Sequence, residues 1–288
     1  MSLQFNVPTP LEYFASLVRE GGNQQETIPL LEAAACIAQD AYPLLDVQQV
    51  LDEVDQLQVR LARTIEPSAE PMRRLTALNQ FFFSDLGFSG NLNNYYDTDN
   101  SYLNVVLRSR RGIPISLAVL WLELAQSVNL RAHGISFPGH FLVKVQLPEG
   151  QVVIDPTSGR SLSREDLSER LETFVVDSRN ASDGSLRDLA EYLRSASPRQ
   201  ILVRMLRNLK EIHRAEGDWQ RLIDVQSRLI ALLPEAWSEW RDRGFAHVER
   251  GHMVDAISDL ETYLAHEGES VDAEAIQELL LRLRESQS

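Results

Sequence analysis

Hydrophobic residues in the first third of the chain recur every three or four positions, the spacing that places them on one face of an α-helix. One such stripe contains Leu11, Phe14 and Leu17. Further stripes are formed by Leu31, Ala34, Ala35 and Ala38, by Val50, Val54, Leu57 and Leu61, and by the apolar residues from Met72 to Phe83. The pattern therefore predicts helices from Pro10 to about Leu86.

The middle of the chain begins with a loop and continues into the most apolar helix of the sequence. Residues 87–96 (GFSGNLNNYY) are rich in Gly and Asn, which favours a loop, and Asp99 or Asn100 is expected to cap a short helix that ends near Arg108. The next helix starts at Pro114, a residue suited to a first helical turn. Its sequence, PISLAVLWLELAQSVN, is apolar on nearly all sides. We therefore expect it to be the buried central helix of the domain.

Short apolar or alternating runs follow this helix. Residues 132–137, 141–147 and 152–154 are separated by Pro-Gly and Pro-Glu-Gly, which indicates antiparallel strands joined by tight turns. Helical sequence returns at 163–174. The predicted fold class is α+β: mostly helical, with a small antiparallel sheet packed on the central buried helix, and with helical repeats at the C-terminal end.

The C-terminal part contains an internal repeat. Aligning Gly217 with Gly251, thirty-four residues apart, pairs Leu222 with Ala256 and Leu229 with Tyr263. Thirty-four residues is the period of the tetratricopeptide repeat, and residues 273–284 are expected to form a helix that covers the last repeat. We expect two domains, residues 1–196 and residues 197–288; the alternative for the second is an ordinary helical bundle with chance spacing.

Composition limits the partners of the protein. The 288 residues include 42 acidic and 28 basic side chains, a formal net charge of −14, which opposes binding to nucleic acid or to an anionic membrane. A single cysteine, Cys36, permits no internal disulfide, and no apolar run approaches the roughly 18 residues of a membrane span. We therefore expect a cytoplasmic protein with no membrane span.

Three polar residues on successive predicted elements suggest a reaction centre. Ser116 lies in the first turn of the buried helix, His140 at the start of a strand and Asp155 at the end of the next strand. A nucleophile at a helix N-terminus, a base and a carboxylate that orients the base form the general nucleophilic triad. The alternatives are structural: Ser116 caps its helix, His140 makes one hydrogen bond, and Asp155 starts the turn Asp-Pro-Thr-Ser-Gly.

The order of these residues and the segments RRGIPISLAVLWLELAQSVNLRAHGISFPGHFLVKV and VVIDPTSG resemble the SirB-type bacterial family. In that family, a degenerate transglutaminase-like domain of the papain-type superfamily precedes tetratricopeptide repeats. The resemblance implies that Ser116 occupies the position of the cysteine nucleophile of active enzymes. A helix N-terminus and a histidine can ionise a thiol, but a hydroxyl needs a base acting in concert with its attack.

Two functions follow as expectations. The first is a non-catalytic, regulatory or interaction protein that binds peptide segments of a protein partner through its cleft and its helical repeats. The alternative is a serine-dependent amide or ester hydrolase or acyl transferase that uses Ser116, His140 and Asp155. Cys36, among small apolar neighbours, is expected to be an inert buried thiol. No cofactor is expected, and no metal site, since the other histidines show no shared ligand spacing.

Overall fold

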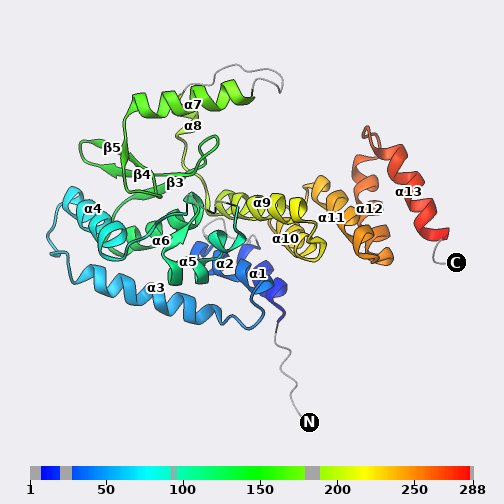
Figure 1. The fold of residues 1–288 in the computed structure, drawn as a ribbon, viewed down its shortest axis with the longest axis horizontal. Coiled ribbons are helices and arrows are strands. Elements are labelled where there is room, and N and C mark those ends of the chain that lie inside the picture. The colour runs from blue at the N-terminus through cyan, green and yellow to red at the C-terminus, as the bar shows by residue number, and fades with distance from the viewer. Residues whose placement is uncertain (1–7, 20–27, 92–93, 95, 179–188, 286–288) are drawn as a thin grey trace, which may run out of the picture. The chain divides into compact units, whose positions relative to one another are not determined.

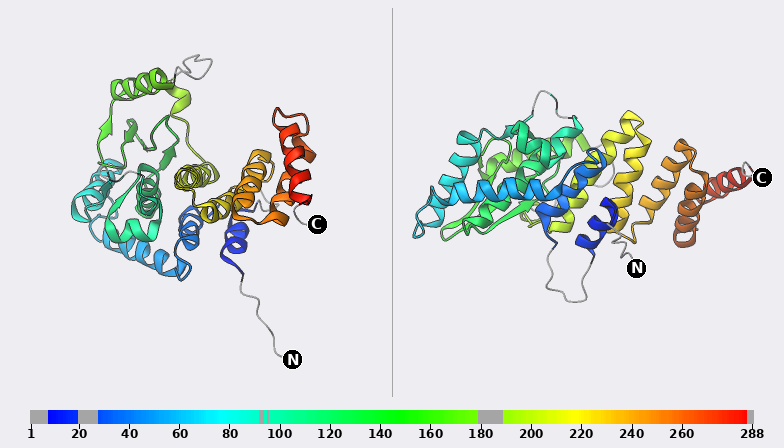
Figure 2. Two further views of the ribbon diagram at one scale, coloured as in Figure 1. Left: turned by 45° about the vertical axis from the view of Figure 1, so that its right-hand side comes forward. Right: turned by 90° about the horizontal axis from the view of Figure 1, so that it is seen from below.

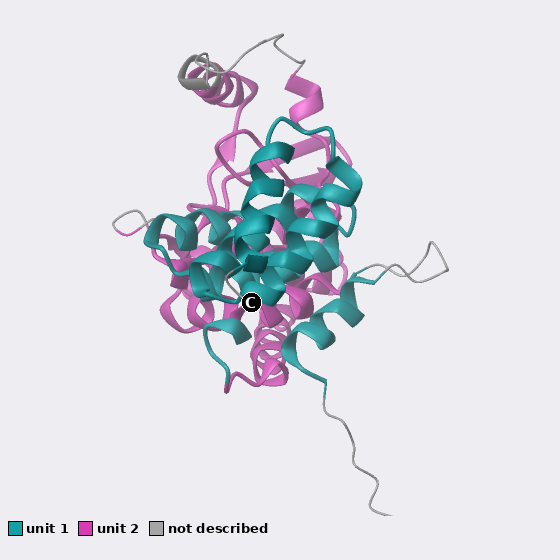
Figure 3. Cartoon of the chain, turned by 90° about the vertical axis from the view of Figure 1, so that its right-hand side faces the viewer, with its two compact units in different colours: residues 1–28, 39–43, 206–288 teal, residues 29–38, 44–205 magenta. Residues whose placement is uncertain are grey.

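The fold is described from a computed structural model, in which residues 8–19, 28–91, 94, 96–178 and 189–285 are described. The chain divides into two compact units (Figure 3). Unit 1 consists of residues 1–28, 39–43 and 206–288, and unit 2 of residues 29–38 and 44–205. The boundary between residues 205 and 206 falls inside helix α9 (Pro198–Glu216).

Unit 2 is built around one buried helix, α6 (Pro114–Ser127). Its residues are apolar on most sides, and ten of its fourteen are buried, so it has neighbours all round. Figure 1 and Figure 2 show α6 between the sheet on one side and helices on the other. The packed helices are α2 (Leu30–Ile37), α3 (Val47–Ala62), α4 (Pro71–Asn79) and α5 (Leu103–Ser109). The predicted central buried helix is confirmed.

The sheet is antiparallel, with strand order β3-β4-β5-β6. The strands are β3 (Ala132–Ile135), β4 (Leu142–Leu147), β5 (Gly150–Ile154) and β6 (Ser161–Leu162). Val143 is paired with Ile154, and Val145 with Val152, so their side chains share the face toward α6. The neighbouring pair of Lys144 with Val153 points to the opposite face. Both faces are therefore covered, and the predicted small sheet on a central helix is confirmed.

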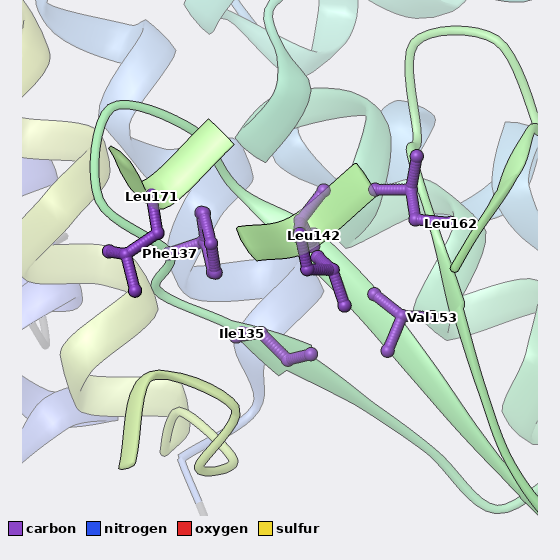
Figure 4. Close-up of a cluster of buried hydrophobic side chains, with 7 residues drawn as sticks. Ile135, Phe137, Leu142, Val153, Leu162 and Leu171 are labelled. Atoms are coloured by element: carbon purple, nitrogen blue, oxygen red, sulfur yellow. The ribbon is translucent and has the colours of Figure 1, made fainter. Parts of the chain in front are cut away.

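The second face of the sheet is covered by α7 (Arg164–Ser178) and the short α8 (Leu189–Tyr192). In Figure 1, α7 lies on the opposite side of the sheet from α6. Figure 4 shows the resulting cluster, in which strand side chains meet Leu171 of α7; its members are Ile135, Phe137, Leu142, Val153, Leu162, Leu167 and Leu171. This second, smaller core holds α7 on the sheet.

Unit 1 contains the C-terminal helices together with the first helix of the chain, α1 (Pro10–Val18). The other helices are the end of α9, α10 (Trp219–Leu232), α11 (Trp237–Arg250), α12 (Met253–Glu267) and α13 (Ala273–Glu285). Helix α1 packs on α10, where the guanidinium of Arg228 lies 4.9 Å from the ring centre of Phe14. Arg228 is buried and forms two hydrogen bonds of 2.6 Å with Asp40. An N-terminal segment thereby becomes part of the repeat core.

The repeats have the geometry that their spacing predicts. Gly217 and Gly251 adopt φ angles of +70° and +74° between the helices of each pair, a left-handed conformation that favours glycine. A Cβ at Gly244 would lie 2.8 Å from the side chain of Leu260, so a small residue is required where α11 and α12 approach. Helix α13 covers α12 with Ile276, Leu280 and Leu283. The predicted covering helix is confirmed.

One local prediction is wrong. Asp97, not Asp99 or Asn100, provides the cap: its carboxylate accepts the backbone N–H of Asp99 and starts a 3₁₀ turn at Thr98–Ser101. This Asx turn ends before α5, which begins without a side-chain cap.

Among the described residues, no helix combines the length and apolarity needed to cross a membrane.

Candidate functional site

Ser116 lies in the first turn of α6 and is completely buried. Its hydroxyl lies 2.6 Å from the backbone carbonyl oxygen of Asn100 and 3.0 Å from that of Ile113, and donates to both. A hydroxyl has one proton, so the two carbonyls share it. Ser116 therefore forms hydrogen bonds at the start of the helix. Its hydroxyl donates to carbonyls and does not accept a helix N–H, as a capping serine would.

The carbonyl that accepts from Ser116 belongs to a self-bonded loop. The side-chain amide of Asn100 donates to the carbonyl of Asn94 at 2.6 Å, and that of Asn91 donates to the side-chain oxygen of Asn100 at 2.9 Å. The carbonyl of Asn100 also accepts the backbone N–H of Ile113 at 3.2 Å. Ser116 thus fastens this loop to the start of α6.

The space around the Ser116 hydroxyl is tightly filled. A Cβ at Gly112 would lie 2.7 Å from the Ser116 Oγ and 3.2 Å from side-chain carbons of Leu117 and Val106. Gly112 lies in the two-residue strand β2 (Arg111–Gly112), which pairs in parallel with β1 (Ser89–Gly90). These two short strands, which the sequence analysis did not anticipate, bring the backbone close to the hydroxyl.

His140 and Asp155 are brought together by neighbouring strands. The Nε2 of His140 lies 3.1 Å from Oδ1 of Asp155, at ion-pair distance, although the ring N–H is not aligned for a hydrogen bond. The His140 side chain is 23% exposed, and that of Asp155 only 7%. His140 thus retains access to solvent, and its Nδ1 is the ring nitrogen left for another group.

Asp155 is held from several directions. Its Oδ1 accepts the backbone N–H of Thr157 at 3.0 Å and the Thr157 hydroxyl at 2.6 Å, and its Oδ2 accepts from Arg170 of α7 at 3.0 Å. Burial raises the pKa of Asp155, but the close His140 imidazole and the hydrogen bonds from Thr157 outweigh it and hold that pKa well below its usual range. The carboxylate is therefore ionised at neutral pH.

The three candidate residues are only partly assembled. His140 and Asp155 are neighbours, whereas within the described part of the chain the structure places no hydrogen bond between Ser116 and His140. The Ser116 proton points to backbone carbonyls, which are acceptors but not bases at neutral pH. Cys36, on α2, is completely buried, as its small apolar neighbours predict.

A groove for which the sequence gives no local signal lies on the face of the sheet opposite α6. Its volume is about 650 Å³, within the usual range for ligand pockets. Strands β4 to β6 form its floor, and α7 and α8 form its walls. Its lining includes Lys144, Val153, Leu162, Arg164, Leu189 and Arg194. Among the described residues that line it, three are cationic and none is acidic.

The cations of the groove come from three separate elements. Lys144 of β4 donates to the carbonyl of Leu193 at 2.7 Å, and its burial lowers the pKa of its ammonium below the usual value. Arg164 starts α7 and is exposed, and Arg194 follows α8, where it lies 3.7 Å from Glu191. Because 144, 164 and 194 are far apart in the chain, only the fold reveals this grouping.

Sequence comparison places both parts of the chain in known families. Residues 48–207 match the transglutaminase-like superfamily, and residues 209–281 match the tetratricopeptide repeat. A UPF0162 protein of Xylella fastidiosa strain Temecula1 is 41% identical over 83% of this chain and 84% of its own length. The chain belongs to the UPF0162 family.

Other UPF0162 proteins are more distant. The Pseudomonas aeruginosa protein PA3419 is 32% identical over 73% of this chain and 74% of its own length. The Escherichia coli K12 protein YchA is 27% identical over 75% of this chain and 78% of its own length. No solved structure matches the chain. The two family matches confirm the predicted order of a transglutaminase-like domain followed by tetratricopeptide repeats.

Proposed function

We propose that this protein is a non-catalytic member of the transglutaminase-like superfamily that binds a peptide segment of a protein partner. The observation that carries the proposal is the hydrogen bonding of Ser116, whose buried hydroxyl donates to the carbonyls of Asn100 and Ile113. Tetratricopeptide repeats generally mediate protein–protein interaction and are present here, which supports the same conclusion.

The chemistry of serine explains why this contact counts against catalysis. A serine hydroxyl attacks a carbonyl only if a base removes its proton as the bond forms. At Ser116 the proton is directed to two backbone carbonyls, and the side chain is fully covered. Attack requires breaking these bonds and opening the packing beside Gly112. This arrangement favours a role for Ser116 in fastening the loop.

The groove on the sheet is the surface that we assign to the peptide. Its floor and walls offer apolar contact from Val153, Leu162 and Leu189, and its rim offers the cations of Arg164 and Arg194. On a chain with a net charge of −14, a groove whose described lining residues include three cations and no acidic side chain favours an anionic occupant by charge complementarity. The proposed ligand is therefore an extended segment that alternates acidic and apolar residues.

Binding of defined peptides tests this proposal. We expect the full-length protein to bind a fluorescent peptide of alternating Asp and Leu, and not a peptide of the same length in which Lys replaces Asp. Arg164→Glu should weaken binding by about three- to tenfold, the range for reversing one exposed charge. Rising salt should weaken binding further, because it screens exposed charges.

The matched control is Arg73→Glu, which makes the same charge change on an exposed arginine of α4 that does not line the groove. This variant should bind the acidic peptide as the parent does. Equal binding of the two peptides, or equal loss in Arg164→Glu and Arg73→Glu, would show that the groove is not the binding surface.

A serine-dependent amide or ester hydrolase or acyl transferase is the second candidate, favoured by the 3.1 Å approach of His140 and Asp155. A fluorophosphonate probe and an activated ester distinguish the two functions. If the protein is non-catalytic, the parent and the variants Ser116→Ala and Cys36→Ala show the same background level of probe labelling and of ester turnover. Labelling or turnover that disappears only in Ser116→Ala would establish the enzyme.

A further inference from the structure

Three potential metal ligands meet at the turn between α11 and α12 in the second repeat. They are His247 in the last turn of α11, His252 before α12 and Asp255 in the first turn of α12. One ligand atom from each lies within 4.8 Å of the others. The two imidazoles face each other with their Nδ1 atoms 3.4 Å apart.

This separation is the one that a shared metal ion requires. Two nitrogen ligands at the Zn–N distance in tetrahedral geometry lie about 3.3–3.4 Å from each other. A hydrogen bond between two imidazoles also brings nitrogens close, but it needs a proton on one of the facing atoms. It does not account for the carboxylate of Asp255, an oxygen of which lies within 4.8 Å of a nitrogen of each ring.

The turn itself holds the two histidines in this arrangement. The backbone N–H of His252 donates to the carbonyl of His247 at 2.9 Å, and that of Gly251 donates to Val248 at 2.9 Å. Gly251 has the left-handed conformation that lets the chain reverse here. Asp255 follows His252 by three residues, at the spacing that places the side chains of a helix start on one side. The ligands are therefore fixed by backbone geometry.

A second carboxylate lies behind His247. Nε2 of His247 is 3.8 Å from Oδ2 of Asp259, and Asp259 is fixed by two hydrogen bonds of 2.7 Å from Arg243. Metal-binding histidines commonly direct their second ring nitrogen to a carboxylate, which orients the ring and leaves the first nitrogen free for the metal. Nε2 of His247 lies on the side of Asp259, and Nδ1 is the nitrogen that faces His252, so Nδ1 is the proposed ligand atom.

The first repeat provides an internal comparison. Its turn has the same backbone, since Gly217 has a φ of +70° and the N–H of Asp218 donates to the carbonyl of His213 at 3.0 Å. Thirty-four residues earlier, however, Asp218 stands in place of His252 and Arg221 in place of Asp255. An arginine at that position opposes a metal ion. The ligand set therefore belongs to the second turn and is not a property of the repeat.

We infer that His247, His252 and Asp255 bind one divalent transition-metal ion of the zinc class, joining the end of α11 to the start of α12. Two imidazoles and one carboxylate are a donor set that suits Zn²⁺ and similar ions. Three protein ligands leave one position of a tetrahedral ion for water or for a donor group of a partner. This inference does not depend on the proposed peptide groove, which lies in unit 2.

Titration of the full-length, chelator-treated protein with Zn²⁺ tests the inference. Isothermal calorimetry should give one Zn²⁺ per chain, and Co²⁺ should give the visible absorption of a tetrahedral site. His252→Ala and Asp255→Arg, which recreates the first repeat at that position, should each weaken Zn²⁺ binding about tenfold or more. Zn²⁺ should also raise the melting temperature of the parent and not of these variants.

The control removes a histidine from elsewhere: His133→Ala alters an exposed residue of β3 and should bind Zn²⁺ as the parent does. Circular dichroism checks that each variant is folded. If His252→Ala does not fold, Asp255→Asn, a nearly isosteric change of an exposed residue, replaces it as the ligand variant. The inference is overturned if the parent shows no saturable Zn²⁺ binding. It is equally overturned if folded ligand variants bind Zn²⁺ as His133→Ala does.

Discussion

Replacing Ser116 by alanine distinguishes a structural serine from a catalytic one by the sign of the stability change. Active-site nucleophiles are often held at some expense of stability, so that their removal is neutral or stabilising. A serine that fastens a loop has the opposite effect. Because the Ser116 hydroxyl bonds Asn100, sixteen residues earlier in the chain, its loss should weaken the attachment of that loop to α6.

The size of the effect follows from the contacts. A buried hydrogen bond contributes about 0.5–1.5 kcal/mol net, and an acceptor left without a partner costs about 1–3 kcal/mol. The carbonyl of Asn100 keeps the N–H of Ile113 at 3.2 Å, so the lower part of these ranges applies. Alanine regains roughly 0.5 kcal/mol through its helix propensity. We therefore expect Ser116→Ala to lower the free energy of unfolding by about 1 kcal/mol.

Urea unfolding with hydrogen exchange read out on the α6 segment measures this change within unit 2. The readout is local because a chain with two compact units need not unfold in one step. Ser127→Ala is the matched control: the hydroxyl of this exposed serine of the same helix donates to the carbonyl of Leu124, three residues away, at 2.8 Å. Its effect should be below about 0.5 kcal/mol. A neutral or stabilising effect of Ser116→Ala would refute the structural role.

Three further predictions concern stability. Gly112→Ala should destabilise unit 2 by about 1–3 kcal/mol, because the added Cβ lies 2.7 Å from the Ser116 Oγ; the same exchange assay should show partial recovery when Ser116→Ala is added. Burial and Asp40 raise the pKa of Asp224 to about 6, so its folded form binds more protons than the unfolded chain above pH 4. Its contribution to stability is therefore lost as pH rises through about 6, and Asp224→Asn should raise the melting temperature at pH 7.5 but not at pH 4. Lys210→Met should destabilise unit 1 by about 3–5 kcal/mol in urea unfolding, because it leaves the buried carboxylate of Glu239, 2.5 Å from the Lys210 Nζ, without its cation.

Much of the fold could be predicted because its signals are local. The all-round apolar sequence after Pro114 implies a helix with neighbours on every side, and the sharp turns after it imply antiparallel strands. The repeat could be found because Gly217 and Gly251 are required by backbone geometry at a fixed spacing. In each case a residue type reports directly on the conformation or burial of its own segment.

The parts that could not be predicted depend on contacts between distant segments. An amphipathic stripe shows that Phe14 has a buried face but not that Arg228 of α10 covers it. The acceptor of the Ser116 hydroxyl is a backbone carbonyl, and every residue type has one. The sequence therefore indicated three candidate residues, whereas the direction in which the serine proton points required the structure.

The cluster of His247, His252 and Asp255 was missed for a different reason. His247 lies in the last turn of α11 and His252 precedes α12, so the two do not form a ligand spacing on a single helix. They converge because the chain reverses at Gly251. A search for histidines on both sides of a repeat-turn glycine would have found them.

The tight surroundings of Ser116 have an evolutionary consequence. Sulfur is larger than oxygen and forms a longer bond to carbon, so a cysteine at this position would press against the Asn100 carbonyl, now 2.6 Å from the hydroxyl, and against the backbone at Gly112. A thiol introduced here by a single substitution would thus displace the neighbouring loop as well. Thiol chemistry at this position would therefore need further changes that open the space around residue 116.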